Sequence, residues 1–267
     1  MAIQFETRGP IAILVIDCPE ALNALDVATL RELRARLGEV RDRDDLRVAI
    51  LTGSGNRAFC AGANLKGTAV SPASYAQALF HSADTSADMG LYIRLMDITD
   101  VGLFKPVIAA VNGHCLGAGL EIALQCDLRI ASTSATFGLP EATVGSIPGV
   151  SGMHRLLKAV PPAHAMHMTL TGERITSTEA TRIGLVSEVV EPEALLDRAM
   201  AIASRIAGNA PLAVQAIKKL SRQTGHLSEP DAQQLTELYW GVLRDTEDRG
   251  EGRRAFAEKR SPQFVGR

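Results

Sequence analysis

Two glutamates in the middle of the chain follow short glycine-containing turns and enter apolar runs. Glu121 stands in GHCLGAGLEIALQCD (113–127), and Glu141 stands in TFGLPEATV (136–144). A carboxylate among apolar side chains is costly to ionise, so its pKa rises toward the range that suits acid or base catalysis. The spacing also allows a structural interpretation, in which each carboxylate only binds the N-terminus of a helix. Glu121 and Glu141 are therefore a candidate acid–base pair that could face one another across a cleft.

Glycine turns can serve several chemistries, because their exposed N–H groups bind phosphate, dinucleotides or a developing oxyanion. Such turns lie at 59–65, 113–127 and 145–152. The Walker pattern is absent, and Ile122 stands where the dinucleotide fingerprint needs a third small residue. The hydrolase elbow G-x-S-x-G fails at Met153, which indicates that Ser151 starts a helix and is not a nucleophile. The glycine turns are therefore better suited to stabilising an oxyanion than to binding a nucleotide.

Metal and redox chemistry find little support in the sequence. His164 and His167 could share a helical face, but no carboxylate or cysteine at ligand spacing accompanies them, and we expect no metal site. The four cysteines lack any C-x-x-C pattern, and we expect reduced thiols that lie mostly in the core. They are Cys18, Cys60, Cys115 and Cys126.

Strands and helices alternate through the first two thirds of the chain, which predicts an α/β fold. Apolar strands are expected at 3–7 and 11–17, joined by a turn at 8–10, and further strands at 48–52 and 106–111. Asp26 is expected to cap a helix whose apolar face carries leucines and a valine at helical spacing. A long helix is expected over much of 73–99, and another helix carries Glu121.

The last third of the chain changes to a mostly helical pattern. Helices are expected at 177–183, 192–208, 211–223 and 229–247. Thr176 and Glu179 form a capping-box pattern, and Pro211 and Pro230 sit just inside helix starts, where a missing N–H costs little. We expect an α/β core over residues 1–200 and a helical region over residues 201–267, which packs on the core or on a neighbouring subunit.

Composition excludes several partners. Over 267 residues, 28 Lys and Arg stand against 30 Asp and Glu, and the net charge of −2 gives no electrostatic footprint for nucleic acid or an anionic membrane. No apolar stretch approaches the ~20 residues of a membrane span, and no signal peptide is visible at the start. We expect a cytoplasmic protein with no nucleic-acid or membrane partner.

Taken together, three motifs carry a family resemblance. FCAGANL (59–65), KPVIAAVNGHCLGAGLEIALQCD (105–127) and FGLPEATVGSIPG (137–149) resemble the crotonase superfamily, typified by enoyl-CoA hydratase, and the likeness runs from 19–25 to 251–260. The resemblance implies a spiral of repeated ββα units with C-terminal helices that build a homotrimer or a hexamer of two trimers. It implies no cofactor, because coenzyme A enters as part of an acyl-CoA thioester substrate.

The resemblance also assigns backbone donors and substrate contacts. It places one oxyanion-hole N–H at Ala63 and the other at Ala118, where many relatives have glycine; a main-chain donor tolerates the methyl group if the local φ/ψ suits alanine. Further substrate contacts are implied at Ala61, Asn64, Leu65, Lys66 and Gly149, with Asn64 standing where aspartate is common. Lys259 is either a contact to the CoA of a neighbouring subunit or a plain surface lysine.

The resemblance implies addition of water across the 2,3 double bond of an enoyl-CoA, or the reverse dehydration. Two N–H donors would stabilise the enolate-like oxygen, each contributing on the order of 3 kcal/mol, while Glu121 and Glu141 handle water and the Cα proton. Relatives that only shift a double bond typically keep one acid, near position 141. The alternatives are an enoyl-CoA isomerase, a carnitinyl-CoA-type dehydratase, and a non-enzymatic RNA-binding or silent scaffold protein. The acyl pocket is expected to depend on 67–104.

Overall fold

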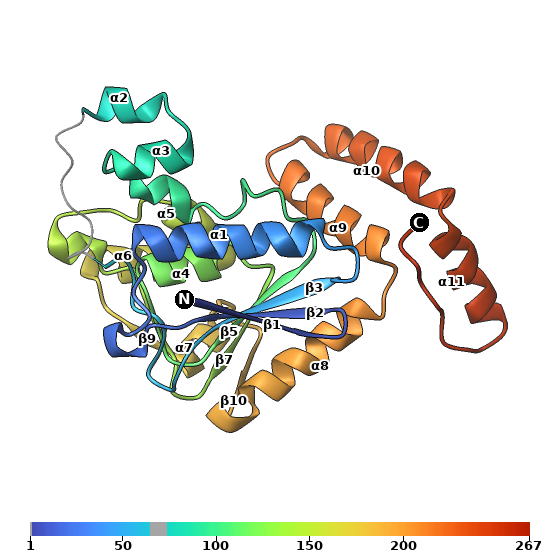
Figure 1. Ribbon diagram of the computed structural model, residues 1–267, viewed down its shortest axis with the longest axis horizontal. Helices are drawn as coiled ribbons and strands as arrows, with labels where there is room; N and C mark the ends of the chain where they lie inside the picture. Colours follow the sequence, from blue (N-terminus) through green and yellow to red (C-terminus); the bar gives the residue numbers. More distant parts are fainter. Residues whose placement is uncertain (1, 65–73) are drawn as a thin grey trace.

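The computed structural model describes residues 2–64 and 74–267, which form two β-sheets surrounded by helices (Figure 1). The larger sheet has the order β1-β2-β3-β5-β7-β10, and the smaller has the order β4-β6-β8-β9. The strands of the larger sheet are β1 (Ile3–Arg8), β2 (Ile11–Ile16), β3 (Val48–Gly53), β5 (Val107–Val111), β7 (Leu128–Ser132) and β10 (Glu188–Val190). Those of the smaller sheet are β4 (Ala58–Cys60), β6 (His114–Leu116), β8 (Thr136–Gly138) and β9 (Ile175–Thr176).

The larger sheet is buried on both faces because successive side chains of a strand point to opposite sides. In β2 and β3, one alternate set of side chains joins the core that includes helix α1 (Val27–Asp42), and the other set joins the core of α8 (Leu195–Ala207). Figure 1 shows these two helices on opposite sides of the sheet. Asp26 accepts a hydrogen bond from the N–H of Thr29, which confirms the predicted cap of α1.

Three successive strand pairs wind between the sheets. β3, β5 and β7 each enter the larger sheet, and the next strand in each case, β4, β6 or β8, enters the smaller one. β4, β6 and β8 pair in parallel, so their carboxyl ends meet at one edge. Each of the three motifs passes through one of these ends, and the winding therefore brings residues 61–63, 117–121 and 139–141 together. This winding confirms the expected spiral of ββα units.

The remaining helices are mostly short. The α-helices are α2 (Tyr75–Leu79), α3 (Ala83–Asp88), α4 (Ala118–Ala123), α5 (Gly152–Ala159), α6 (Pro162–Thr171), α7 (Ser177–Arg182), α9 (Pro211–Thr224), α10 (Glu229–Arg244) and α11 (Glu247–Ala257). The 3₁₀ helices are η1 (Pro19–Ala21), η2 (Tyr92–Met96), η3 (Glu141–Val144) and η4 (Pro192–Ala194).

The expected long helix over 73–99 is wrong where the structure describes it. This segment contains α2, α3 and η2 in place of one helix. Ser74 caps α2, Ser82 starts α3 by accepting from the N–H of Thr85, and Gly90 takes a φ of +90° that ends any helix. Local capping and a left-handed glycine therefore outweigh the apolar spacing.

The C-terminal helices begin close to the predicted positions, with Pro211 and Pro230 in the first turns of α9 and α10. The predicted helix 229–247 ends at Arg244, and Thr246 caps a further helix, α11, that the sequence reading missed. α10 packs on α9, and Figure 1 shows α11 at the right-hand edge of the molecule with the chain terminus between α11 and α9. The predicted division at residue 200 falls inside α8, and it stays a prediction.

α9 is tied to the core by an ion pair whose lysine is buried. The Lys218 ammonium, 5% exposed, lies 2.7 Å from an Asp127 carboxylate oxygen and donates to the carbonyl of Lys105 at 2.8 Å. The same Asp127 oxygen accepts from the N–H of Val107 at the start of β5. The C-terminal helices therefore connect directly to the turn that follows α4.

Candidate active site

Glu121 lies in the first turn of α4, inside the core. Its side chain is nearly fully buried, and its Oε1 accepts hydrogen bonds from the N–H groups of Val150 at 2.7 Å and Gly152 at 3.1 Å. Burial raises the pKa of Glu121, and the N–H groups of Val150, Gly152 and Gly149 act in the opposite direction because they stabilise the carboxylate. Glu121 is therefore a basic, ionisable carboxylate held through one oxygen.

Glu141 lies at the start of η3 and has fewer partners. Burial, and secondarily the charge of Glu121, raises the pKa of Glu141 to about 7. Its Oε2 is buried and has no hydrogen-bond partner among the described residues. Because a Cβ at Gly117 would lie 3.2 Å from Glu141 Oε1, the glycine turn packs directly against this carboxyl. The two glutamates thus interact, and a pKa of about 7 leaves Glu141 partly protonated near neutral pH.

Two backbone amides stand where an oxyanion could bind. Leu25 donates to the carbonyl of Gly62 and accepts from the N–H of Asn64, so the N–H of Ala63 between them points away from Leu25. Ala118 is the first residue of α4, a position whose N–H has no partner within the helix. A Cβ at Gly62 would lie 3.7 Å from the nitrogen of Ala118, which shows that the two turns lie close together.

The local backbone explains the alanine at 118. Gly117 has a φ of +51° and Gly62 a φ of +113°, conformations that favour glycine, whereas Ala118 is not among the positive-φ residues. A Cβ at Gly119 would lie 2.2 Å from the carbonyl oxygen of Cys60, so this glycine allows α4 to approach β4. The glycines of this turn are accounted for by close packing around the site, without a nucleotide.

One cavity of about 430 Å³ joins these groups. Its lining includes six of the predicted site residues, namely Ala61, Ala63, Ala118, Glu121, Glu141 and Gly149. Asn64 does not line it and donates its N–H to Leu25, while Leu65 and Lys66 lie outside the described residues. The winding of the strands therefore brings together residues that the sequence separates by almost 90 positions.

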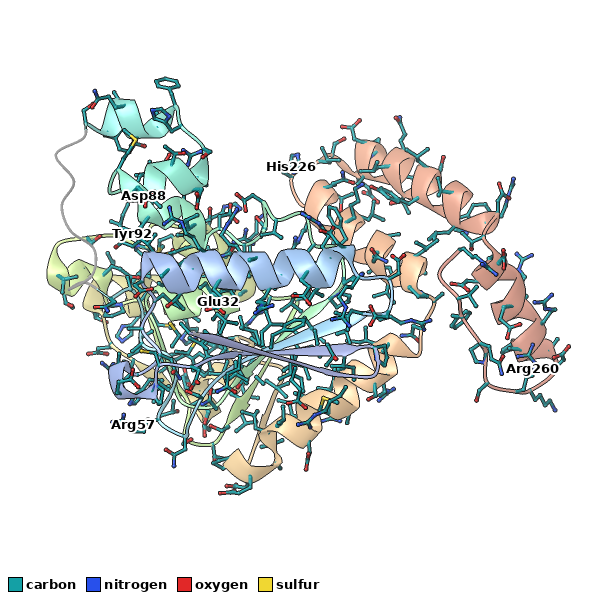
Figure 2. The ribbon with its side chains drawn as sticks, in the orientation of Figure 1. Glu32, Arg57, Asp88, Tyr92, His226 and Arg260 are labelled. Atoms are coloured by element: carbon teal, nitrogen blue, oxygen red, sulfur yellow. The ribbon has the colours of Figure 1, made fainter. Side chains whose placement is uncertain are left out.

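η2 supplies a wall of the cavity that the sequence reading did not name by residue. Tyr92, Ile93 and Met96 line it, and they fall within the segment 67–104 to which the acyl pocket was assigned. Figure 2 places Tyr92 between α3 and α1, and η2 packs against both of these helices and against α4. The sequence offers no distinctive signal for these three residues, because large apolar side chains recur in any buried segment.

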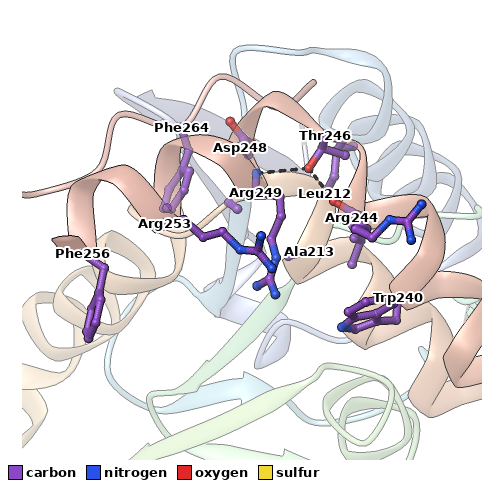
Figure 3. Close-up of a pocket in the computed structure, with 13 residues that line it drawn as sticks. Leu212, Ala213, Trp240, Arg244, Thr246, Asp248, Arg249, Arg253, Phe256 and Phe264 are labelled. Atoms are coloured by element: carbon purple, nitrogen blue, oxygen red, sulfur yellow. Dashed lines mark hydrogen bonds between the residues drawn. The ribbon is translucent and has the colours of Figure 1, made fainter.

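A second cavity of about 540 Å³ lies among the C-terminal helices, between Trp240, Phe256 and Phe264 (Figure 3). Its one lining carboxylate, Asp248, accepts the N–H groups of Val265 and Gly266 and so holds the C-terminal segment in place. The cavity of Glu121 and Glu141 is the candidate active site, because it joins two buried carboxyls of raised pKa to the turns of Ala63 and Ala118.

Other chemistry has no comparable cluster. Among residues 2–64 and 74–267, no three His, Cys, Asp or Glu side chains gather as metal ligands, and no helix is long and apolar enough to cross a bilayer. His167 binds Glu173, and His164 lies 3.8 Å from Glu179, so the two histidines face separate carboxylates. Ser151 stands at the N-cap of α5, as predicted, with a φ of +61°.

Comparison with known proteins identifies the family. The model of the enoyl-CoA hydratase/isomerase family matches residues 6–267. The chain belongs to this family. It is 44% identical to (E)-benzylidenesuccinyl-CoA hydratase of Thauera aromatica over the full length of both chains, and 40% identical to carnitinyl-CoA dehydratase of Proteus mirabilis over 100% of this chain and 99% of that one. Among solved structures, an enoyl-CoA hydratase from Bacillus anthracis superposes with a TM-score of 0.90 at 35% identity, covering both chains completely.

Proposed function

We propose that this enoyl-CoA hydratase/isomerase family member adds water across the 2,3 double bond of an enoyl-CoA thioester, or catalyses the reverse dehydration. The observation that carries the proposal is the cavity in which two buried glutamates with raised pKa values stand beside the turns of Ala63 and Ala118. Hydration needs a base for water, an acid for Cα and donors for the thioester oxygen, and this cavity offers all three.

In this proposal the two N–H groups of Ala63 and Ala118 bind the thioester oxygen. Attack of water at Cβ moves the double-bond electrons toward the carbonyl, so negative charge builds on that oxygen before Cα is protonated. Preorganised donors stabilise this charge, each by on the order of 3 kcal/mol. Coenzyme A is part of the substrate, and no further cofactor is needed for the electrons or protons to balance.

The environments of the two glutamates suggest different roles. Glu121 has backbone donors on Oε1 that favour its charged form, which suits a base that takes a proton from water. Glu141 has an unpartnered buried oxygen and a pKa of about 7, which suits an acid that gives a proton to Cα. Because the two carboxyls interact, their titrations belong to the pair.

The relatives support an acyl group that is more than a plain short chain. The hydratase of Thauera aromatica is named for benzylidenesuccinyl-CoA and the dehydratase of Proteus mirabilis for carnitinyl-CoA, and both names denote substituted acyl groups. We propose a substituted or extended enoyl-CoA for this chain as well. The side chains of η2 supply an aromatic and apolar wall for it.

We also propose a homotrimer or a hexamer of two trimers. Large apolar side chains of α10 and α11 are strongly exposed in the single chain, with Trp240 at 55%, Val242 at 64% and Phe256 at 87%. Patches of this kind mark association surfaces. Sedimentation of the purified protein measures the state directly, and a monomer at micromolar concentration contradicts this assembly.

The function is tested by the loss of ultraviolet absorbance as the conjugated enoyl thioester is hydrated. Crotonyl-CoA and longer or substituted enoyl-CoA esters are supplied to the wild type and to Glu121→Gln and Glu141→Gln. We expect turnover by the wild type and a loss of at least about 100-fold in each variant. Glu193→Gln, an exposed glutamate of η4, is the matched control and retains activity.

Two results would contradict the proposed hydration mechanism. Absence of hydration together with exchange of the Cα proton indicates the isomerase reaction, which needs one acid. Full activity in both glutamine variants contradicts the mechanism, since neither carboxylate would then act on water or Cα.

A further inference from the structure

Gln125 is a buried amide in the turn that ends α4, one helical turn beyond Glu121. It is 4% exposed, and both ends of its side chain are hydrogen-bonded. Its Oε1 accepts the N–H of Ile98 at 2.9 Å, and its Nε2 donates to the carbonyl of Met96 at 3.0 Å. Nε2 also lies 3.2 Å from the carbonyl of Glu121. One side chain therefore joins the helix of the first glutamate to the backbone at the end of η2.

The segment that Gln125 holds forms a wall of the candidate active site. Tyr92, Ile93 and Met96 of η2 line the cavity. Ile93 also approaches Gly149 on the opposite loop, because a Cβ at Gly149 would lie 3.3 Å from Ile93 Cγ2. A shift of η2 by a fraction of an ångström would therefore change the width of the cavity beside Gly149.

We propose that Gln125 is a positioning residue that sets which acyl groups the cavity admits, by fixing η2 to α4. The inference rests on the proposed function, in that the ligand is an acyl-CoA. The carboxamide is suited to this task because it offers an acceptor to one backbone group and a donor to the next. A methionine at this position can fill the same volume but forms no hydrogen bond with these backbone groups. An ionised glutamate places a second acceptor oxygen against the carbonyls of Met96 and Glu121.

The chemistry of the site does not depend on these bonds. The carboxylate of Glu121 is held by the N–H groups of Val150 and Gly152, and the thioester oxygen is assigned to Ala63 and Ala118. Loss of the Gln125 bonds therefore leaves the reacting groups in place and loosens the wall. Acyl carbons beyond Cβ have to lie against the rest of the lining, to which η2 contributes three side chains. A short acyl chain is insensitive to that wall, and a long one is not.

η2 has a second attachment on its outer side. Arg34 of α1 donates to the carbonyls of Leu95 and Asp97. Loss of the Gln125 bonds is therefore expected to let η2 shift on a remaining anchor without unfolding. A change in selectivity, and not a general loss of binding, is the consequence.

The test uses saturated acyl-CoA esters, which bind without reacting. Isothermal titration calorimetry gives the Kd of butyryl-CoA and decanoyl-CoA for the full chain in the wild type and in Gln125→Met. We expect the Kd of butyryl-CoA to stay within about twofold and that of decanoyl-CoA to rise about tenfold, equivalent to ~1.4 kcal/mol. Ser177→Ala is the matched control, because it removes the hydrogen bond of a buried side chain to the carbonyl of Thr133, neither residue lines the cavity, and the ratio of the two Kd values is expected to stay unchanged.

Gln125→Glu adds a readout that a merely structural role would not move. A protonated glutamate regains a donor for the carbonyl of Met96, so the ratio of Kd values is expected to return toward that of the wild type as pH falls and to depart from it as pH rises. Ionisation of Glu121 or Glu141 over the same pH range is expected to change the Kd of both esters alike. The ratio of the two Kd values in one variant is therefore independent of that ionisation.

Equal weakening of both esters in Gln125→Met, or no change in either, overturns the inference. Failure of the wild type to bind either ester overturns both the inference and the proposed function. Binding with the expected change of ratio, but no hydration of any enoyl-CoA, leaves the positioning role standing and removes only the reaction.

Discussion

Replacing Gly152 by alanine tests the arrangement of Glu121 with a single methyl group. Gly152 is the first residue of α5, and its backbone is not in a positive-φ conformation, so alanine is compatible with the chain. The added Cβ would lie 2.6 Å from Glu121 Oε1, 2.9 Å from Glu121 Cγ and 2.8 Å from Pro148 Cβ. All three distances are below those of real Cβ contacts, so the carboxylate has to move away from the N–H groups that hold it.

The magnitude follows from the bonds that are displaced. Hydrogen bonds to charged groups contribute about 1.5–3 kcal/mol each, and Glu121 accepts them from Val150 and Gly152. Displacing the carboxylate from these donors also displaces it from the water that it deprotonates, and a misplacement of about 1 Å in a catalytic group lowers kcat about 10- to 100-fold. Overpacking costs a further ~1–3 kcal/mol of folding free energy. Because the lost donors favoured the charged form, the pKa of Glu121 rises further, and the acid-side limb of the rate profile shifts to higher pH.

The assay is hydration of an enoyl-CoA measured from pH 5 to 9, together with thermal unfolding. Gly38→Ala is the matched control, since a Cβ at Gly38 in α1 meets no heavy atom within 4 Å and alanine stabilises a helix by up to ~1 kcal/mol relative to glycine. The control is expected to keep its kcat and gain stability. A Gly152→Ala enzyme with wild-type kcat and an unshifted pH profile would refute the assignment of Glu121 as a base held by these N–H groups.

Four further outcomes are expected. The thermal stability of Glu141→Gln relative to the wild type is expected to be higher at pH 8 than at pH 5. The folded-state pKa of Glu141 is about 7, above the usual value near 4.5, so the wild-type protein loses stability as pH rises through this window. The glutamine variant does not titrate there and keeps its stability. Wild-type hydration falls above about pH 7, as Glu141 loses the proton that it supplies, which a flat profile from pH 6 to 9 would contradict. Ser151→Gly raises the free energy of unfolding by up to ~1 kcal/mol in urea denaturation, because Ser151 has a φ of +61°. Lys218→Met lowers the free energy of unfolding by ~1.5–3 kcal/mol, because the charged hydrogen bonds of Lys218 to Asp127 and to the carbonyl of Lys105 are lost, and an unchanged urea midpoint would show that these bonds contribute nothing.

The sequence predicts best where one local signal acts alone. Asp26 caps α1, the apolar runs of β2 and β3 are buried on both faces, and the proline-marked starts of α9 and α10 are correct. Where signals compete, apolar spacing misleads. The segment 73–99 has spacing compatible with one helix, but Ser82 and Gly90 divide it. α11 was missed because the cap at Thr246 lies only two residues beyond the preceding helix.

The site could be predicted in part for a different reason. Glu121 and Glu141 are conspicuous in sequence because each breaks an apolar pattern next to a glycine turn, and such breaks are expected at functional sites. Tyr92, Ile93 and Met96 break no pattern, since large apolar side chains are expected in any core. Their place in the cavity follows from tertiary packing through Gln125, a long-range contact that no local rule contains.

The two acids differ although both are buried, and the reason lies in the chain segments that follow them. The loop after Glu141 passes over Glu121 and turns three amides toward it, from Gly149, Val150 and Gly152. Among the described residues, none donates a hydrogen bond to Oε2 of Glu141. Gly117 packs against the other oxygen, Oε1, of the same carboxyl. The loop thus lowers the free-energy cost of ionising Glu121. Glu141 has no such donors, and burial raises its pKa to about 7. An exchange of roles between the glutamates would therefore require a different path for residues 142–152, and substitutions confined to the acids themselves are expected to abolish the reaction without redirecting it.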